Sequence, residues 1–156
     1  MANLYENIIS VAEAKKYLRL DEDFEEDNDD IERMIASALE YITKQTNYVF
    51  RVQEKTYRQD YDCNIVIYDY PVNTTDFSPN IPLYYSGYIK FKNTDVVTAS
   101  VGFTSKADEG FPHALIDCAL QIIKYYYYGS ETNENSTLMP KAVEEIIRTY
   151  RRCIIV

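Results

Sequence analysis

The chain has 156 residues, of which 46% are hydrophobic and 26% charged, and its formal net charge is −9. This length and composition are those of an ordinary globular domain and exclude a disordered chain. The negative charge disfavours a protein that wraps nucleic acid through phosphate contacts. No apolar run approaches the length of a membrane span, and the first ten residues lack the pattern of a signal peptide, so neither is expected.

The whole net charge lies in one short segment, residues 21–32, which holds nine carboxylates and no base. The chain has 25 acidic and 16 basic residues, so the remainder is balanced. The segment is a metal-binding loop, a solvated turn, or a surface that repels another polyanion. These three possibilities frame the functional question.

Two helices are predicted before residue 48. Ser10 and Glu13 form a capping box that predicts a helix from Val11 to about Leu20, with Val11, Ala14, Tyr17 and Leu18 on one side. A second capping signal runs from Asp29 to Glu32. Apolar residues then recur at spacings of three and four, which predicts a helix ending near Thr46-Asn47 with one buried stripe: Ile31, Met34, Ile35, Ala38, Leu39 and Ile42.

From Tyr48 to Gly110 the pattern is typical of strands. Segments rich in β-branched and aromatic residues alternate with turn signals, and predict four or five short strands at residues 56–58, 65–68, 88–92 and 96–103. The connections are too short for crossover helices, so an antiparallel sheet is expected. Asn73 to Pro82 is expected to be a protruding loop.

Two more helices are predicted after Pro112. The first has an apolar stripe and ends at Gly129; the stripe comprises Leu115, Ile116, Ala119, Leu120, Ile123, Tyr126 and Tyr127. The second follows Pro140, directs Val143, Ile146, Ile147 and Tyr150 inward, and exposes Arg148, Arg151 and Arg152.

The predicted fold is therefore α+β and mainly α, in a single domain spanning residues 1–156. It has an N-terminal helical pair with the acidic loop (1–47), a small antiparallel β-rich insert (48–110) and a C-terminal helical pair (111–156).

The acidic segment has part of a calcium-binding pattern. Asp21, Asp23, Glu25, Asp29 and Glu32 fall at positions 1, 3, 5, 9 and 12 of an EF-hand loop. Position 6, where the loop needs glycine, is Glu26. Nine carboxylates also exceed what one Ca²⁺ needs. A solvated turn is favoured, with Ca²⁺ binding as the alternative, and no cofactor is expected.

Signals for catalysis are sparse, so the chain is not expected to be an enzyme. His113, the only histidine, has Asp117 one helical turn later, which is typical of a local polar contact. Cys118 is predicted to lie on the buried side of its helix. Cys63, Cys118 and Cys153 form no CxxC pair and are expected to be buried free thiols in a reducing cytosol. The four glycines match no phosphate-binding loop.

The chain has sixteen tyrosines and no tryptophan. Four of them, Tyr125 to Tyr128, are consecutive in a predicted helix and must point in all directions around it. Two readings stay open: half in the core and half exposed, or a protein–protein interface, where tyrosine is enriched. Tyr125 and Tyr128 are the interface candidates.

The order of these motifs resembles the head–tail connector (adaptor or head-completion) proteins of long-tailed phages. The matching segments are residues 11–21, 29–31, 41–47, 100–103, Pro112 with the helix ending in tyrosines, and 138–151. The chain differs from that family in a longer β region, in Thr46-Asn47 where Thr-Gly is commoner, and in its unusually acidic loop.

The resemblance implies a structural protein at the head–tail junction of a virion, assembled in the host cytoplasm. About twelve copies would form a ring beneath the portal protein and above a stopper or tail-completion protein. DNA would pass through its channel without specific binding, and no membrane is involved. Arg148, Arg151 and Arg152 would contact the portal or a neighbouring copy. A further alternative is a DNA-mimic inhibitor, although such proteins spread their carboxylates and this chain confines them to one loop.

Overall fold

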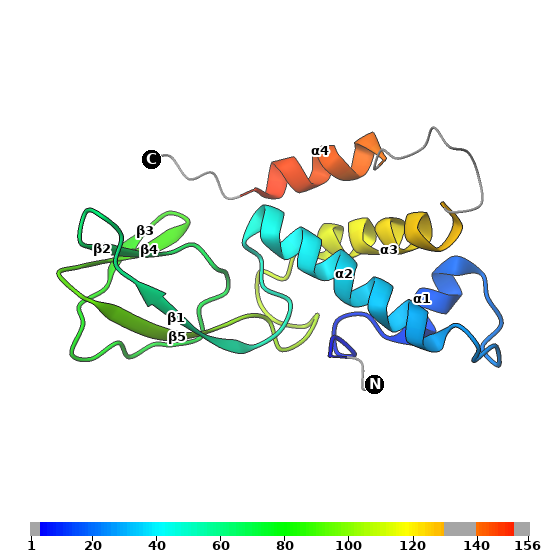
Figure 1. Cartoon of the computed structure of the whole chain (residues 1–156), viewed down its shortest axis with the longest axis horizontal. Coiled ribbons are helices and arrows are strands. Elements are labelled where there is room, and N and C mark those ends of the chain that lie inside the picture. The colour runs from blue at the N-terminus through cyan, green and yellow to red at the C-terminus, as the bar shows by residue number, and fades with distance from the viewer. Residues whose placement is uncertain (1–3, 130–139, 152–156) are drawn as a thin grey trace. The chain divides into compact units, whose positions relative to one another are not determined.

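The computed structural model describes residues 4–129 and 140–151 (Figure 1). The described chain is α+β, with four helices and small antiparallel sheets, and all strands lie between α2 and α3. Two compact units are present: the described residues of 1–46 and 104–151 form a helical unit, and Asn47–Phe103 forms a β unit. Each unit is described by itself. The single domain expected for 1–156 stays a prediction.

Helix α1 (Val11–Leu18) begins as its capping box predicts, because the Ser10 Oγ accepts a hydrogen bond from the Glu13 N–H at 3.1 Å. It ends at Leu18, since Arg19 adopts a left-handed conformation and its N–H turns back to the Lys15 and Lys16 carbonyls. The buried side differs from the prediction. Tyr17 is 40% exposed, and Lys15 is buried with its Nζ donating to the Glu22 carbonyl.

Helix α2 (Asn28–Thr46) begins one residue before the predicted cap, so Asp29 and Asp30 lie in its first turn, where the helix dipole favours carboxylates. Its end is as predicted, with Asn47 at a φ of 62°. The stripe is confirmed at five positions and only half-buried at Met34; the buried residues are Ile31, Ile35, Ala38, Leu39 and Ile42.

Helix α3 (His113–Tyr128) packs along α2, and α4 (Lys141–Tyr150) packs against both (Figure 1). The α3 stripe is confirmed from Leu115 to Ile123 and extends to Cys118 and Ile122. At its end the prediction is wrong, because Tyr126 is 37% exposed. In α4, Val143 and Ile147 are buried. No helix in the described ranges has both the length and the apolar character that a membrane crossing requires.

The strands of the β unit form two antiparallel sheets where one was expected. Strands β1 (Gln53–Arg58) and β5 (Val96–Val101) form one, and the other has the order β2-β4-β3. Its strands are β2 (Asn64–Ile67), β3 (Leu83–Tyr85) and β4 (Tyr88–Lys92). The sequence did not indicate β3, which has three residues, all exposed.

One hydrophobic cluster joins the two sheets, and Phe91 lies within it. The Phe91 ring is fully buried, with the Phe77 ring edge-on at 5.0 Å between centroids. The remaining buried members are Val49, Ile65, Ile67, Val97, Ala99 and Val101. The expected protruding loop, Asn73 to Pro82, is therefore partly wrong. Its Phe77 is buried, and the Asn73 N–H bonds to the Ser100 carbonyl at 2.8 Å.

Candidate interaction surfaces

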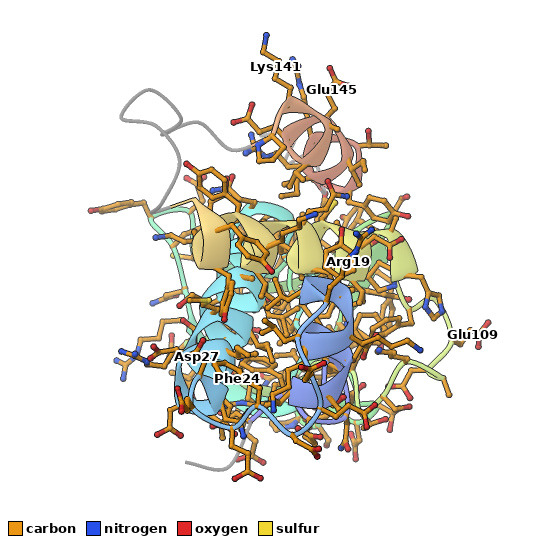
Figure 2. All side chains as sticks on the ribbon, turned by 90° about the vertical axis from the view of Figure 1, so that its right-hand side faces the viewer. Arg19, Phe24, Asp27, Glu109, Lys141 and Glu145 are labelled. Atoms are coloured by element: carbon orange, nitrogen blue, oxygen red, sulfur yellow. The ribbon has the colours of Figure 1, made fainter. Side chains whose placement is uncertain are left out.

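The acidic loop connects α1 to α2 in two successive turns. The Phe24 N–H donates to the Asp21 carbonyl at 3.1 Å, and the Asn28 N–H donates to the Glu25 carbonyl at 3.2 Å. Figure 2 shows Phe24 and Asp27 on this loop. Within residues 21–27, which precede α2, five carboxylates are exposed, and they form no ion pair within the described part of the chain: Asp21, Glu22, Asp23, Glu25 and Glu26.

The structure does not bring the calcium candidates together. Asp21, Asp23 and Glu25 lie in the loop, whereas Asp29 and Glu32 belong to α2. Among residues 4–129 and 140–151, no group of three or more His, Cys, Asp or Glu residues is placed to hold a metal ion. The arrangement fits a solvated turn that hydrogen bonds hold in place at its two ends.

Two of the four consecutive tyrosines fix this loop to the end of α3. The Tyr127 hydroxyl donates to the Asp27 carboxylate at 2.6 Å, and the Tyr128 hydroxyl donates to the Leu18 carbonyl at 2.7 Å. Tyr128 thus satisfies a carbonyl in the last turn of α1. Both tyrosines connect segments about one hundred residues apart in the sequence, so Tyr128 has a structural role besides its exposure.

We expect Tyr127→Phe to lower the free energy of unfolding by about 1 kcal/mol and Tyr128→Phe by about 0.5 kcal/mol. The first effect is larger because the lost bond goes to a carboxylate. Urea denaturation of both variants measures the difference. Tyr126→Phe is the matched control. An equal loss in all three variants would contradict the role of the two hydroxyl groups.

An open groove lies beside these tyrosines, with a cavity volume of about 390 Å³. Tyr125 lines it, as does Tyr128, so both predicted interface tyrosines face one concave surface of the helical unit. The other lining residues are Tyr17, Gln121, Lys124, Gly129 and Pro140. The lining combines three tyrosines with polar side chains, and aromatic residues are enriched at protein-contact surfaces.

The basic surface predicted for α4 is present in part. Arg148 is exposed, and the exposed Arg151 donates from Nη2 to the Gln45 Oε1 at 2.6 Å. Arg152 lies outside the described residues. Lys141, at the start of the helix, and Glu145, near its middle, project outward (Figure 2). The helix therefore displays both signs of charge.

The residues considered for catalysis are not assembled into a site. His113 and Asp117 are both exposed on α3, and no hydrogen bond joins them in the described chain. Cys118 is buried, as predicted, whereas Cys63 is exposed, so the expected burial is wrong at that position. Burial, together with the negative charge of Asp117, raises the pKa of the Cys118 thiol to about 11. A thiol in this state is protonated near neutral pH and is a poor nucleophile.

We expect Cys118 to resist alkylation by iodoacetamide at pH 8 in the folded protein, while the exposed Cys63 reacts. Mass spectrometry of tryptic peptides measures each position. In denaturant both thiols should react at similar rates, which serves as the control. Rapid modification of native Cys118 would contradict its burial.

Polar contacts also fix β1 to the segment after β2. The Tyr57 hydroxyl donates to Asp69 at 2.5 Å, and the Lys55 Nζ lies 3.1 Å from the same carboxylate. Burial and the adjacent Asp69 raise the pKa of Tyr57 far above its usual range.

The helical unit has polar contacts of its own. Hydrogen bonds from Thr104 lower the pKa of Asp108, and Lys106 forms an ion pair with Glu13.

The outer face of the β2-β4-β3 sheet is a further surface, which was not predicted from the sequence. Phe91 points to the core, so alternation places Lys90 and Lys92 on the opposite side. The Tyr88 ring lies 4.8 Å from Tyr85 and 5.7 Å from Tyr68, which makes a row of three tyrosines across the sheet. The alternation in Tyr88-Ile-Lys-Phe-Lys92 is the signal that could have revealed it.

No protein-family model and no curated protein sequence matches this chain. Among the solved structures that share its fold are two chains of virus-like particles. A chain in the neck of an empty gene transfer agent (GTA) particle, computed with C6 symmetry, superposes with a TM-score of 0.72 at 14% sequence identity. A chain in the virion of a native gene transfer agent particle superposes with a TM-score of 0.70 at 13% identity. Each match covers 100% of this chain and 95% of the other.

Proposed function

We propose that this protein is a structural subunit of a virion neck, a head–tail connector that forms a ring beneath the portal. The observation that carries the proposal is the full-length similarity of fold to a chain in the neck of a gene transfer agent particle. Because the match spans both the helical unit and the β unit, it is not a likeness of one small motif. The motif order, which resembles connector proteins, supports the same function independently of the coordinates.

The ring would contain about twelve copies, joined head to tail so that one face of each copy contacts a different face of the next. The sixfold symmetry of the similar neck is compatible with this number. The ring would bind the portal on one side and a stopper or tail-completion protein on the other. It has no catalytic role and is placed at the head–tail junction after assembly in the host cytoplasm.

The charge distribution suits such a channel. A genome passing through must not bind to the wall, and neutral or acidic surfaces repel a polyanion. This chain confines its excess of nine negative charges to residues 21–32 and is balanced elsewhere. DNA would therefore slide past it without specific contacts.

Electron microscopy of the protein mixed with its portal tests the proposal. We expect a cap of density on the portal, with rotational symmetry in multiples of six and a continuous central channel. Mixing with an unrelated protein of similar mass is the control. A portal that stays bare at saturating concentrations of this chain would overturn the connector function.

The basic end of α4 is assigned to the portal or a neighbouring copy. Reversal of Arg148, Arg151 and Arg152 to glutamate should prevent ring assembly on the portal, because arginine is suited to paired contacts with carboxylates. The matched control reverses three lysines that are also exposed, Lys16, Lys44 and Lys141. Rings that assemble normally with the arginine variant would exclude this role.

A further inference from the structure

The outer face of the β2-β4-β3 sheet carries aromatic, aliphatic and basic side chains. It comprises Tyr68, Leu83, Tyr85, Tyr88, Lys90 and Lys92. Tyr85 is 49% exposed and Leu83 37% exposed, so apolar area on this face is open to solvent. The three strands together hold two lysines and no acidic residue. Neither lysine forms an ion pair within the described residues.

The acidic loop has the complementary composition. Its five exposed carboxylates include Asp23 and Glu25, which flank the aromatic ring of Phe24. Phe24 is only partly buried, so it is available for further contact. A segment that places one aromatic ring between two negative charges matches a face that places a tyrosine row beside two positive charges.

We propose that the acidic loop of one copy docks on the outer face of the three-stranded sheet of the neighbouring copy. Phe24 packs on the tyrosine row, while Asp23 and Glu25 pair with Lys90 and Lys92. The contact joins two different faces of identical chains, which is the geometry of a ring. The inference rests on the proposed ring and specifies what holds its copies together.

A second copy fits this face better than DNA does. DNA would also be attracted to lysines and could stack unpaired bases on tyrosines. Binding through the phosphate backbone grows with the number of phosphates that basic side chains neutralise, and this face offers only two lysines. The acidic loop of another copy carries a limited negative charge and therefore matches two lysines better than DNA does. The two lysines would also offset two of the nine negative charges of residues 21–32.

Carbodiimide cross-linking of the ring assembled on its portal tests the contact directly, because the reagent joins a lysine to a carboxylate that touches it. The ring is built from an equal mixture of ¹⁴N- and ¹⁵N-labelled full-length chains. We expect linked peptide pairs of mixed label that connect Lys90 or Lys92 to residues 21–25. Pairs with matching labels alone would mean that the contact lies within one chain and would overturn the proposal.

Charge reversal supplies an independent test. Lys90→Glu with Lys92→Glu should weaken association by about tenfold or more, and so should Asp23→Lys with Glu25→Lys. Mixing the two variants should restore assembly, because each reversed sheet then meets a reversed loop. Lys16→Glu with Lys44→Glu is the control of equal charge, and circular dichroism verifies that every variant is folded.

The outcomes separate this inference from the proposed function. A ring that forms without cross-links at Lys90 or Lys92, and tolerates their reversal, overturns the contact and leaves the connector function intact. A bare portal overturns the function itself.

The wild-type chain is also titrated with a double-stranded DNA oligonucleotide in low salt. Binding that the lysine reversal abolishes would assign the face to DNA and exclude the loop.

Discussion

Gly102→Ala is expected to destabilise the β unit by about 3 kcal/mol or more. Gly102 follows β5 with a φ of +117°, a backbone conformation that residues with a side chain rarely adopt. An added Cβ would collide with the Arg51 carbonyl oxygen and lie 2.5 Å from its carbon and 2.9 Å from the Val52 nitrogen. The backbone cannot move away freely, since the Gly102 N–H bonds to the Pro71 carbonyl at 2.9 Å and its own carbonyl accepts from Asn73 at 2.7 Å.

Gly87→Ala is the matched control for this substitution. Gly87, in the turn between β3 and β4, also has a positive φ, at +101°, but no atom lies within 4 Å of the added Cβ. Gly87→Ala should lower the free energy of unfolding by about 1–2 kcal/mol, from backbone strain alone. Hydrogen exchange of the amides in β1 and β5 measures both variants. Equal protection in the two variants would show that the collision with Arg51 is relieved.

Phe91→Ala is expected to lower the stability of the β unit by about 3–5 kcal/mol. The ring is fully buried between the two sheets and contacts Phe77 edge-on, so its removal leaves a cavity and deletes an aromatic pair. Phe77 lies in a segment without regular structure. We therefore expect the residues around Phe77 to lose protection together with the sheet.

Tyr84→Ala removes an aromatic residue from the same sheet and is the control for Phe91→Ala. Tyr84 is 67% exposed, so its loss should cost less than about 1 kcal/mol. Chemical denaturation followed by tyrosine fluorescence, with hydrogen exchange of β2 and β4, measures the two variants. Similar losses in both would contradict the assignment of Phe91 to the centre of the β unit.

The helices could be predicted because their signals are local. The Ser10 capping box, the spacing of apolar residues in α2 and the left-handed Asn47 each involve residues within a few positions of one another. Helix formation depends on contacts of this range. Even so, the prediction of which side of α1 is buried was wrong. Lys15 is buried because its amine reaches a backbone carbonyl, and Tyr17 is exposed in its place.

The tyrosines of α3 show why roles were harder to predict than helices. Tyr127 and Tyr128 bond to atoms of Asp27 and Leu18, about a hundred positions earlier in the chain. No spacing rule relates residues so far apart. The same holds for Phe77, whose burial depends on the position of Phe91 in another strand.

By itself, the sequence determined the α+β class, the four helices, the antiparallel strands between α2 and α3, and the confinement of the excess negative charge to residues 21–32. These follow from periodicity, capping and composition, which are properties of neighbouring residues. Only the tertiary structure decided that the strands divide into two sheets and that β3 joins β4. It also decided which tyrosines tie down the acidic loop, and that Tyr68, Tyr85 and Tyr88 line up beside two lysines. Such surfaces arise from pairing between strands, whose register depends on how both faces of a sheet are buried.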